Sequence, residues 1–163
     1  MSYLSEKEMY PDVMVWLNTY LQHKYRKASI NVFDTSREDL CEFLRRRNLS
    51  KWFPQSDTFV IKVDITGVIV SGDLYRLAFV ECKTNSISLR DISQLIGYSK
   101  VVIPTFAMII SSSGVSPPVN KLMNIYRRYD ILSYKDDLLV RIATWNRRTK
   151  DIDAASVLPH GAF

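Results

Sequence analysis

Three charged residues, Asp64, Glu81 and Lys83, interrupt an otherwise apolar part of the sequence. Because side chains two residues apart on a strand point to the same face, Glu81 and Lys83 project together. Asp64 reaches the same place if a neighbouring strand carries it in the right register. A buried charge needs a partner or a metal ion, since an unpaired one is costly to desolvate. The pattern therefore predicts a functional site.

Two β-rich segments, residues 58–70 and 74–84, carry these charges. The Ser71-Gly72-Asp73 sequence between them is a turn signal flanked by alternating apolar residues, which predicts a hairpin.

Two carboxylates that meet at one point suit a hard divalent cation. Mg²⁺ takes oxygen ligands in near-octahedral geometry and keeps several waters, and the carbonyl of Cys82 is a candidate third protein ligand beside Asp64 and Glu81. Lys83 next to such an ion can orient a water and stabilise its deprotonated form. The alternative interpretation is an ordinary surface pair of Glu81 and Lys83 on an exposed strand.

The order of these residues resembles that of the PD-(D/E)xK nuclease superfamily. Asp64 is followed, after a hairpin, by Phe79-Val80-Glu81-Cys82-Lys83, and then by Gln94 on an expected helix. Lys62 and Val63 precede Asp64 where the name-giving proline stands, and many members of the superfamily also lack that proline. The resemblance covers about residues 1–115.

The resemblance implies an α/β fold, with a central mixed β-sheet flanked by helices and a restriction-endonuclease-like core in the order αβββαβ. It also implies a Mg²⁺-dependent endodeoxyribonuclease, in which Mn²⁺ can substitute, that hydrolyses DNA phosphodiester bonds. Junction resolvases and restriction enzymes are both members, and many act as homodimers because cutting both strands needs two centres.

Two more residues acquire roles from the resemblance. The segment Glu6 to Pro11 is similar to a first-helix pattern Glu-x-x-Leu-Tyr-Pro, whose glutamate enters the metal site. Glu6 is otherwise only a favourable charge at a helix N-terminus, and Glu8 is expected mainly to form a capping box with Ser5. Gln94 would brace the metal site, the alternative being a polar surface position.

Basic residues are candidates for contact with the nucleic-acid backbone. Arg45-Arg46-Arg47 and Lys51 precede the first β-rich segment, and Arg90 begins the helix that carries Gln94. Arginine suits bidentate phosphate contact, but the run is equally well explained as a solvated helix end. Trp52 and Phe53 either stack on bases or, more commonly, pack in the core.

Composition is consistent with one folded domain. The chain has 163 residues and a net charge of +5, with 47% hydrophobic residues. The net positive charge favours a polyanionic partner without requiring one. No apolar run is long enough to span a membrane. Cys41 and Cys82 suggest reduced thiols in a cytoplasmic, reducing compartment.

A pass along the chain predicts a single nuclease domain over residues 1–150 and a loosely ordered tail over 151–163. The expected elements alternate in type, with helices over 5–21, from 35, 88–101 and 119–129, and strands over 29–33, 105–112, 131–134 and 138–145. Met9, Val13, Trp16 and Tyr20 are expected as the inner stripe of the first helix, in which Pro11 is expected to cause a kink.

Other classes of enzyme lack their signatures. The sequence has no P-loop, no Gly-x-Gly-x-x-Gly, no serine-nucleophile elbow and no zinc motif. Besides the nuclease, two alternatives remain: a non-catalytic nucleic-acid-binding module that retains the fold, and a protein-interaction subunit with an incidental basic surface.

Overall fold

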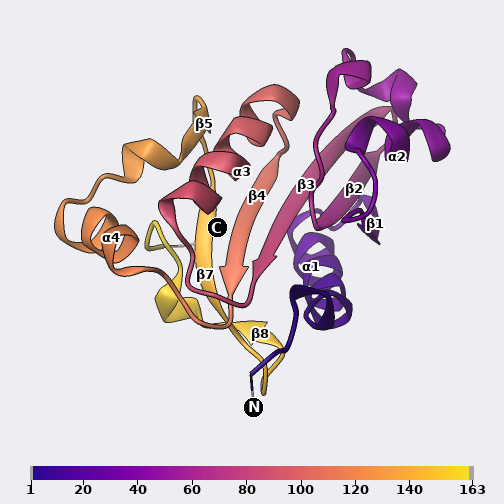
Figure 1. Cartoon of the computed structure of the whole chain (residues 1–163). Coiled ribbons are helices and arrows are strands. Elements are labelled where there is room, and N and C mark those ends of the chain that lie inside the picture. The colour runs from indigo at the N-terminus through magenta and orange to yellow at the C-terminus, as the bar shows by residue number, and fades with distance from the viewer. Residues whose placement is uncertain (1, 162–163) are drawn as a thin grey trace.

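The computed structural model describes residues 2–161, and its centre is a six-stranded mixed sheet with helices on both faces (Figure 1). The predicted α/β class with a central mixed sheet is therefore confirmed. The strands lie in the order β1-β2-β3-β4-β7-β8 and span β1 Ser29–Asp34, β2 Ile65–Ser71, β3 Leu74–Lys83, β4 Phe106–Ser111, β7 Arg141–Asn146 and β8 Asp151–Ile152. β3, β4 and β7 are mutually parallel, and the other neighbouring pairs are antiparallel.

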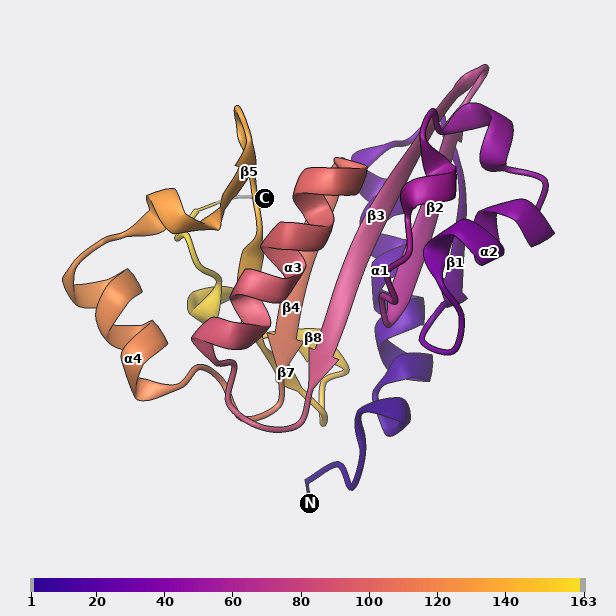
Figure 2. The same ribbon diagram turned by 45° about the horizontal axis from the view of Figure 1, so that its top comes forward.

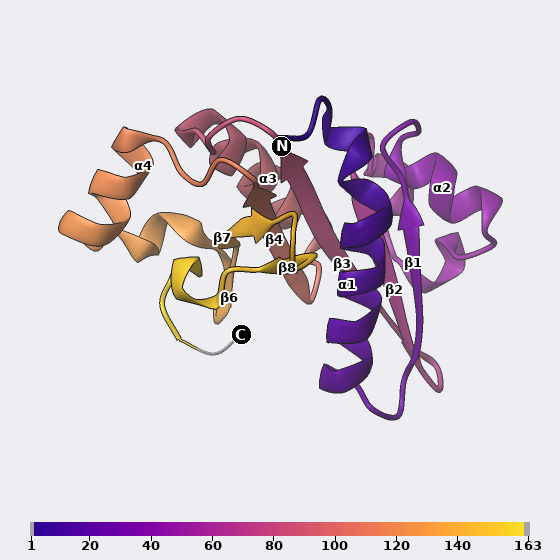
Figure 3. The ribbon, with the colours of Figure 1, turned by 90° about the horizontal axis from the view of Figure 1, so that it is seen from below.

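The helices form two layers, visible from different sides in Figures 2 and 3. One face is covered by α1 (Tyr10–Lys24), whose Val13, Leu17 and Leu21 are fully buried. The other face is covered by three helices and carries a separate apolar cluster: α2 Leu40–Arg46, α3 Leu89–Val102 and α4 Pro117–Asn120. A small hairpin of β5 (Ser133–Lys135) and β6 (Leu138–Leu139) stands outside the main sheet.

The arrowheads of β3 and β4 point to the end of the sheet where the N-terminal segment lies (Figure 1). This follows from the β3-α3-β4 crossover, in which the two strands are parallel. β4 is buried along its whole length, as its apolar sequence predicts. The predicted hairpin is also confirmed, with Gly72 at the first turn position and a φ of +59° that glycine adopts without strain.

The first β-rich segment begins later than predicted. Residues 56–58 form a short 3₁₀ turn, and the ladder starts only at Ile65. The residues between them pair with the start of α2 instead, since the Leu40 amide donates to the Ile61 carbonyl (2.8 Å) and the Cys41 amide to that of Phe59 (3.0 Å). Asp64 consequently stands just before β2, at the end of the sheet.

The first helix also differs from its prediction. The Ser5 side chain makes no capping bond, and the Glu8 carboxylate accepts from the Leu4 amide (3.1 Å). A 3₁₀ turn over Glu6–Glu8 precedes α1, so Pro11 falls in the first turn of α1, where a missing N–H disrupts no helical bond. Pro11 at this position therefore gives no reason for the expected kink in α1.

Val13 is fully buried as predicted, but the second half of the buried stripe of α1 is shifted by one position. Leu17 and Leu21 are fully buried, whereas Trp16 and Tyr20 are half-buried and stack on each other at 5.5 Å. Met9, which was expected in the stripe, is buried just before the helix. The aromatic pair thus covers the edge of the core.

Two later helices have different ends from those predicted. α2 starts at Leu40 rather than near residue 35, because the buried Thr35 hydroxyl bonds to the Val63 carbonyl (2.6 Å) instead of capping a helix. The helix predicted over 119–129 begins at Pro117, continues as a π-helical turn and stops at Ile125. Arg127 has a positive φ of 53°, which ends the helical path.

The C-terminal segment is packed, in contrast to the loose order expected for it. β8 pairs with β7, and Val157 and Leu158 are buried against the sheet. Residues 162–163 of the predicted tail lie outside the described residues. Within residues 2–161, no helix combines the length and apolarity needed to cross a bilayer.

Gly67 allows α1 to approach the sheet closely, because a Cβ there would lie 2.9 Å from Leu21 Cδ1. We expect Gly67→Val to lower the free energy of unfolding by about 1–3 kcal/mol through overpacking. Gly97→Ala is the control, since a Cβ at this α3 position meets nothing within 4 Å and should add about 0.5–1 kcal/mol. Urea unfolding measures both, and a Gly67→Val protein as stable as the parent would contradict this packing.

Candidate functional site

Asp64 and Glu81 lie opposite each other on neighbouring strands. The β2–β3 ladder pairs Ile65 with Val80, so the next pair outward is Asp64 with Glu81. Directly opposed residues of an antiparallel pair share a face of the sheet. Lys83, two residues beyond Glu81, projects to the same face. The register therefore brings together the three charged residues that the sequence singled out.

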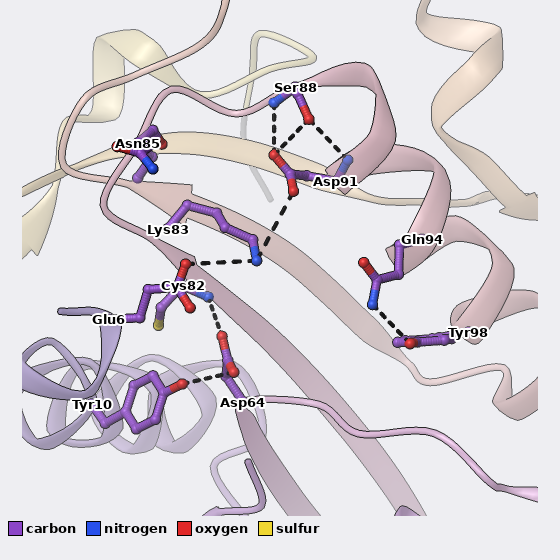
Figure 4. Close-up of polar contacts among 11 residues, drawn as sticks. Glu6, Tyr10, Asp64, Cys82, Lys83, Asn85, Ser88, Asp91, Gln94 and Tyr98 are labelled. Atoms are coloured by element: carbon purple, nitrogen blue, oxygen red, sulfur yellow. Dashed lines mark hydrogen bonds and ion pairs between the residues drawn. The ribbon is translucent and has the colours of Figure 1, made fainter.

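The Asp64 carboxylate is held by both of its oxygens (Figure 4). The Tyr10 hydroxyl of α1 donates to Oδ1 at 2.7 Å, and the Cys82 amide of β3 donates to Oδ2 at 2.9 Å. The Asp64 carbonyl in turn accepts from the Thr35 amide at 3.0 Å. These bonds fix the orientation of Asp64 before any ligand binds.

Glu81 is a buried carboxyl next to a second carboxyl. Its residue is only 9% exposed, and burial raises its pKa to about 9, with contributions from the charge of Asp64 and from hydrogen bonding to it. Lys83 opposes this rise in pKa without cancelling it. Glu81 is consequently neutral at pH 7 when no cation is bound, because two adjacent carboxylates cannot both ionise cheaply in a desolvated place.

Lys83 lies among carboxylates from three directions. Its Nζ is 3.7 Å from Glu6 Oε1 and 4.0 Å from Asp91 Oδ1 (Figure 4). Burial alone lowers the pKa of Lys83, but Glu6 and the other neighbouring carboxylates outweigh burial and raise it, so the ammonium stays charged. For Glu6 itself, burial raises the pKa and Lys83 opposes the rise.

Tyr10 and Asp91 belong to this constellation, although the sequence did not assign them to it. Asp91 forms a capping box with Ser88 at the start of α3. Asp91 Oδ2 accepts from the Ser88 amide and hydroxyl, both at 2.8 Å, which leaves Oδ1 directed toward Lys83. Tyr10 occupies the tyrosine position of the pattern Glu-x-x-Leu-Tyr-Pro, and this match was the feature of the sequence that could have identified it.

Gln94 lies one turn beyond Asp91 on α3, and it is exposed rather than part of the buried face of the helix (Figure 4). Its amide donates to the Tyr98 hydroxyl at 2.8 Å rather than to Asp64 or Glu81. Arg90 is exposed in the first turn of the same helix. The structure thus brings Gln94 near the site without bonding it to the predicted metal ligands.

Cys82 presents its backbone groups, and not its thiol, to the candidate site. Its side chain is fully buried on the α1 face, where burial raises the pKa of the thiol. Its amide points toward Asp64, and the amide and carbonyl of one strand residue point to the same side. The Cys82 carbonyl is therefore directed toward Asp64 and away from β4.

Two of the predicted phosphate-contacting arginines, Arg46 and Arg47, have side-chain partners outside the carboxylate cluster. Arg46 pairs with Glu38, and Arg47 lies over the Phe33 ring at 4.4 Å. Within residues 2–161, no ion pair and no cation–π contact joins these arginines, Arg45 to Arg47, to Asp64, Glu81 or Lys83.

Lys51 lies toward the opposite end of the sheet from the site. Its Nζ is 5.0 Å from the ring of Trp52, which stacks at 4.2 Å on Tyr75 near the start of β3. Trp52 therefore packs on another ring, and at about 3.3 Å per residue Tyr75 is about 26 Å from Lys83.

Among the described side chains, no group of three or more His, Cys, Asp or Glu is arranged to hold a metal ion. Glu6 and Asp91 instead flank Lys83, and Asp64 and Glu81 form a pair. Comparisons of the chain with protein-family models, with curated proteins and with solved structures yield no match.

The raised pKa of Glu81 predicts a pH-dependent stability in the presence of a chelator. Between the unfolded pKa of 4.5 and the folded pKa of about 9, the folded state binds one extra proton, so stability falls as pH rises. Glu81→Gln keeps a hydrogen-bond donor toward Asp64 and does not titrate. We expect urea unfolding to show this variant gaining stability relative to the parent from pH 5 to pH 8.5. Parallel pH profiles for the two proteins would contradict the raised pKa.

The bond from Tyr10 to Asp64 predicts a specific cost for removing one hydroxyl. Tyr10→Phe leaves Asp64 Oδ1 without its buried donor and should lower the free energy of unfolding by about 1–3 kcal/mol. Tyr98→Phe is the matched control, because that hydroxyl accepts only from the exposed Gln94, and it should stay within about 0.5 kcal/mol of the parent. Equal losses in the two variants would show that the Tyr10 bond is not a special support of Asp64.

Proposed function

We propose that this protein is a divalent-metal-dependent endonuclease that hydrolyses DNA phosphodiester bonds, with a restriction-endonuclease-like core. The observation that carries the proposal is the register that sets Asp64 opposite Glu81, with Lys83 on the same face. The order of elements supports it too: a helix, three antiparallel strands, a helix and a parallel strand follow one another, with α2 inserted after β1.

The Asp64–Glu81 pair fits a divalent cation. Two carboxyl groups share one desolvated place, and the proximity of Asp64 helps to raise the pKa of Glu81. A cation between them removes the repulsion that keeps Glu81 protonated. Mg²⁺ commonly uses one or two carboxylates and fills its remaining positions with water and substrate oxygens. Asp64, Glu81 and the Cys82 carbonyl would hold the ion.

The chain's own groups have distinct roles in this proposal. A divalent ion supplies Lewis-acid polarisation of the phosphate and lowers the pKa of water at the site. Tyr10 and the Cys82 amide keep Asp64 in one orientation. Lys83 remains an ammonium and can donate hydrogen bonds to the attacking water or to a phosphate oxygen, where negative charge develops. Glu6 and Asp91 hold Lys83 in place.

A role for Gln94 as a brace of the attacking water would require a change of partner. Its amide is engaged with the Tyr98 hydroxyl, and its side chain already faces the site. A rotation that releases Tyr98 would bring the amide toward the phosphate. Cleavage of both strands of a duplex would need two such centres, and homodimer formation remains a prediction from the family resemblance.

The test is cleavage of plasmid, single-stranded and branched DNA with Mg²⁺, with Mn²⁺ and with EDTA. We expect cleavage that requires the metal and is abolished in Asp64→Asn and Glu81→Gln, which keep size while removing charge. Lys83→Met should cut at least about 100-fold more slowly yet still bind Mn²⁺, because general acid–base and charge-stabilising groups contribute roughly 10²–10⁴-fold. Binding of DNA should persist in all three variants.

Two results would contradict the proposal. If Asp64→Asn or Glu81→Gln cuts at the parent rate, that residue does not hold the ion. If the parent binds DNA in a salt-dependent manner but cuts no substrate with either metal, the alternative of a non-catalytic nucleic-acid-binding module is favoured instead.

A further inference from the structure

A polar pocket of about 410 Å³ lies at the same end of the sheet as the carboxylates. Four parts of the chain line it: the N-terminal residues Ser2 and Tyr3, the loop after β4 at Ser112 and Ser113, the end of β7 through Asn146 and Arg147, and Asp153 after β8. Its size falls within the roughly 300–1,000 Å³ range of ligand pockets. Figure 3 views this end of the molecule directly, with the N-terminus, β7 and β8 close together.

Both sides of the pocket are tied to the candidate site. The Ser112 amide donates to the Lys83 carbonyl at 3.3 Å, and the Ser113 hydroxyl donates to the Thr84 carbonyl at 2.6 Å. On the other side, Trp145 Nε1 donates to the Tyr3 hydroxyl at 2.9 Å, which anchors the segment that leads to Glu6. The pocket therefore lies beside the strand end that carries Lys83.

The lining favours a phosphate over a base. Tyr3 and Trp145 are 6% and 2% exposed, so neither ring offers a free face for stacking. Arg147 Nη1 donates to the Ser2 carbonyl at 2.7 Å, and its guanidinium lies 4.5 Å from the Tyr3 ring. The Arg147 guanidinium has further N–H groups that can donate to a ligand, because an arginine side chain has five N–H donors. One carboxylate, Asp153, lies in the lining, with Oδ1 accepting from the Ala155 amide at 3.1 Å.

The negative charge around Lys83 means that a polyanion can bind at this end of the molecule only with cationic groups nearby. Four carboxylates influence Lys83, which makes the site itself repel a polyanion until a metal ion binds. Arg147 and Arg148 follow β7 in the turn to β8, beside the pocket. By contrast, Lys51 stands near the other end of β3.

We propose that the pocket and the Arg147–Arg148 turn bind the phosphates of the nucleic-acid strand that flanks the bond to be cut. The strand then runs across the carboxyl ends of β3, β4 and β7, the edge at which open α/β sheets bind their ligands. This inference rests on the proposed function, since it names how the same site receives its substrate. It assigns the main phosphate contacts to this turn rather than to Arg45, Arg46 and Arg47.

The experiment measures binding of a labelled 30-base-pair DNA duplex in EDTA, where no cleavage occurs. Asn146→Asp is the sharpest probe, because Asn146 Oδ1 accepts from the Arg148 and Thr149 amides (3.0 and 3.2 Å), a role that an aspartate oxygen retains. The change puts a negative charge at the pocket while preserving the turn. Arg148→Ala removes one cation, and Arg26→Ala, in the exposed turn after α1, is the control of equal charge.

We expect Asn146→Asp and Arg148→Ala each to weaken binding at least about fivefold, with Arg26→Ala within twofold. For Arg148→Ala the slope of log K against log salt should fall in magnitude by about one, as expected for loss of one phosphate contact. Equal effects of Arg148→Ala and Arg26→Ala, or an unchanged Asn146→Asp protein, would overturn the assignment.

Parallel cleavage assays with Mg²⁺ separate this inference from the proposed function. A parent that binds but does not cut, with binding that depends on Asn146 and Arg148, supports the phosphate surface and refutes the nuclease. A parent that cuts, with both variants binding and cutting normally, refutes the phosphate surface alone. A parent that neither binds nor cuts DNA refutes both.

Discussion

The account depends on the apposition of two carboxyl groups, Asp64 and Glu81, in a place largely removed from water. Their repulsion, together with burial, keeps a proton on Glu81 at neutral pH, and a divalent cation is the natural replacement for that proton. In the proposed function, binding of the ion would therefore be coupled to release of a proton. Two buried carboxyl groups side by side destabilise the folded state. Contacts from neighbouring residues compensate by holding them in place.

The support comes from elements that are distant in the sequence. Tyr10 reaches Asp64 from α1, the β3 backbone donates the second hydrogen bond, and the capping box of α3 orients Asp91 toward Lys83. Each of these groups also has a structural task, as part of a helix, a ladder or a cap. The site is therefore built on rigid elements, which keeps charged groups in place without a bound ligand. Gly67, which lets α1 pack closely on the sheet, contributes to this arrangement from a distance.

Sequence reasoning found the hairpin and the three charged residues because these depend on local signals, namely strand alternation and a glycine turn. It missed features set by tertiary contacts. The stripe of α1 is shifted because Trp16 and Tyr20 prefer to stack at the edge of the core, and the C-terminal segment is ordered because β7 offers it a partner. Tyr10 and Asp91 were missed as site residues for the same reason, since only the assembled sheet brings them to Asp64 and Lys83. Phosphate contact by Arg45, Arg46, Arg47 and Lys51 stays a prediction: Arg46 pairs with Glu38, Arg47 lies over the Phe33 ring, and Lys51 lies over the Trp52 ring.

Negative and positive side chains occupy separate parts of one end of the sheet. Carboxylates gather around Lys83, and guanidinium groups flank them on the turn after β7, so the proposed function has the polyanion attracted beside the centre and entering it with the metal ion. The most direct measurement of the central claim is the anomalous scattering of Mn²⁺ in crystals of this protein. The account predicts a manganese peak within coordination distance of both Asp64 and Glu81. A peak that contacts only one of them, or ordered crystals at saturating Mn²⁺ with no peak at this place, would contradict it.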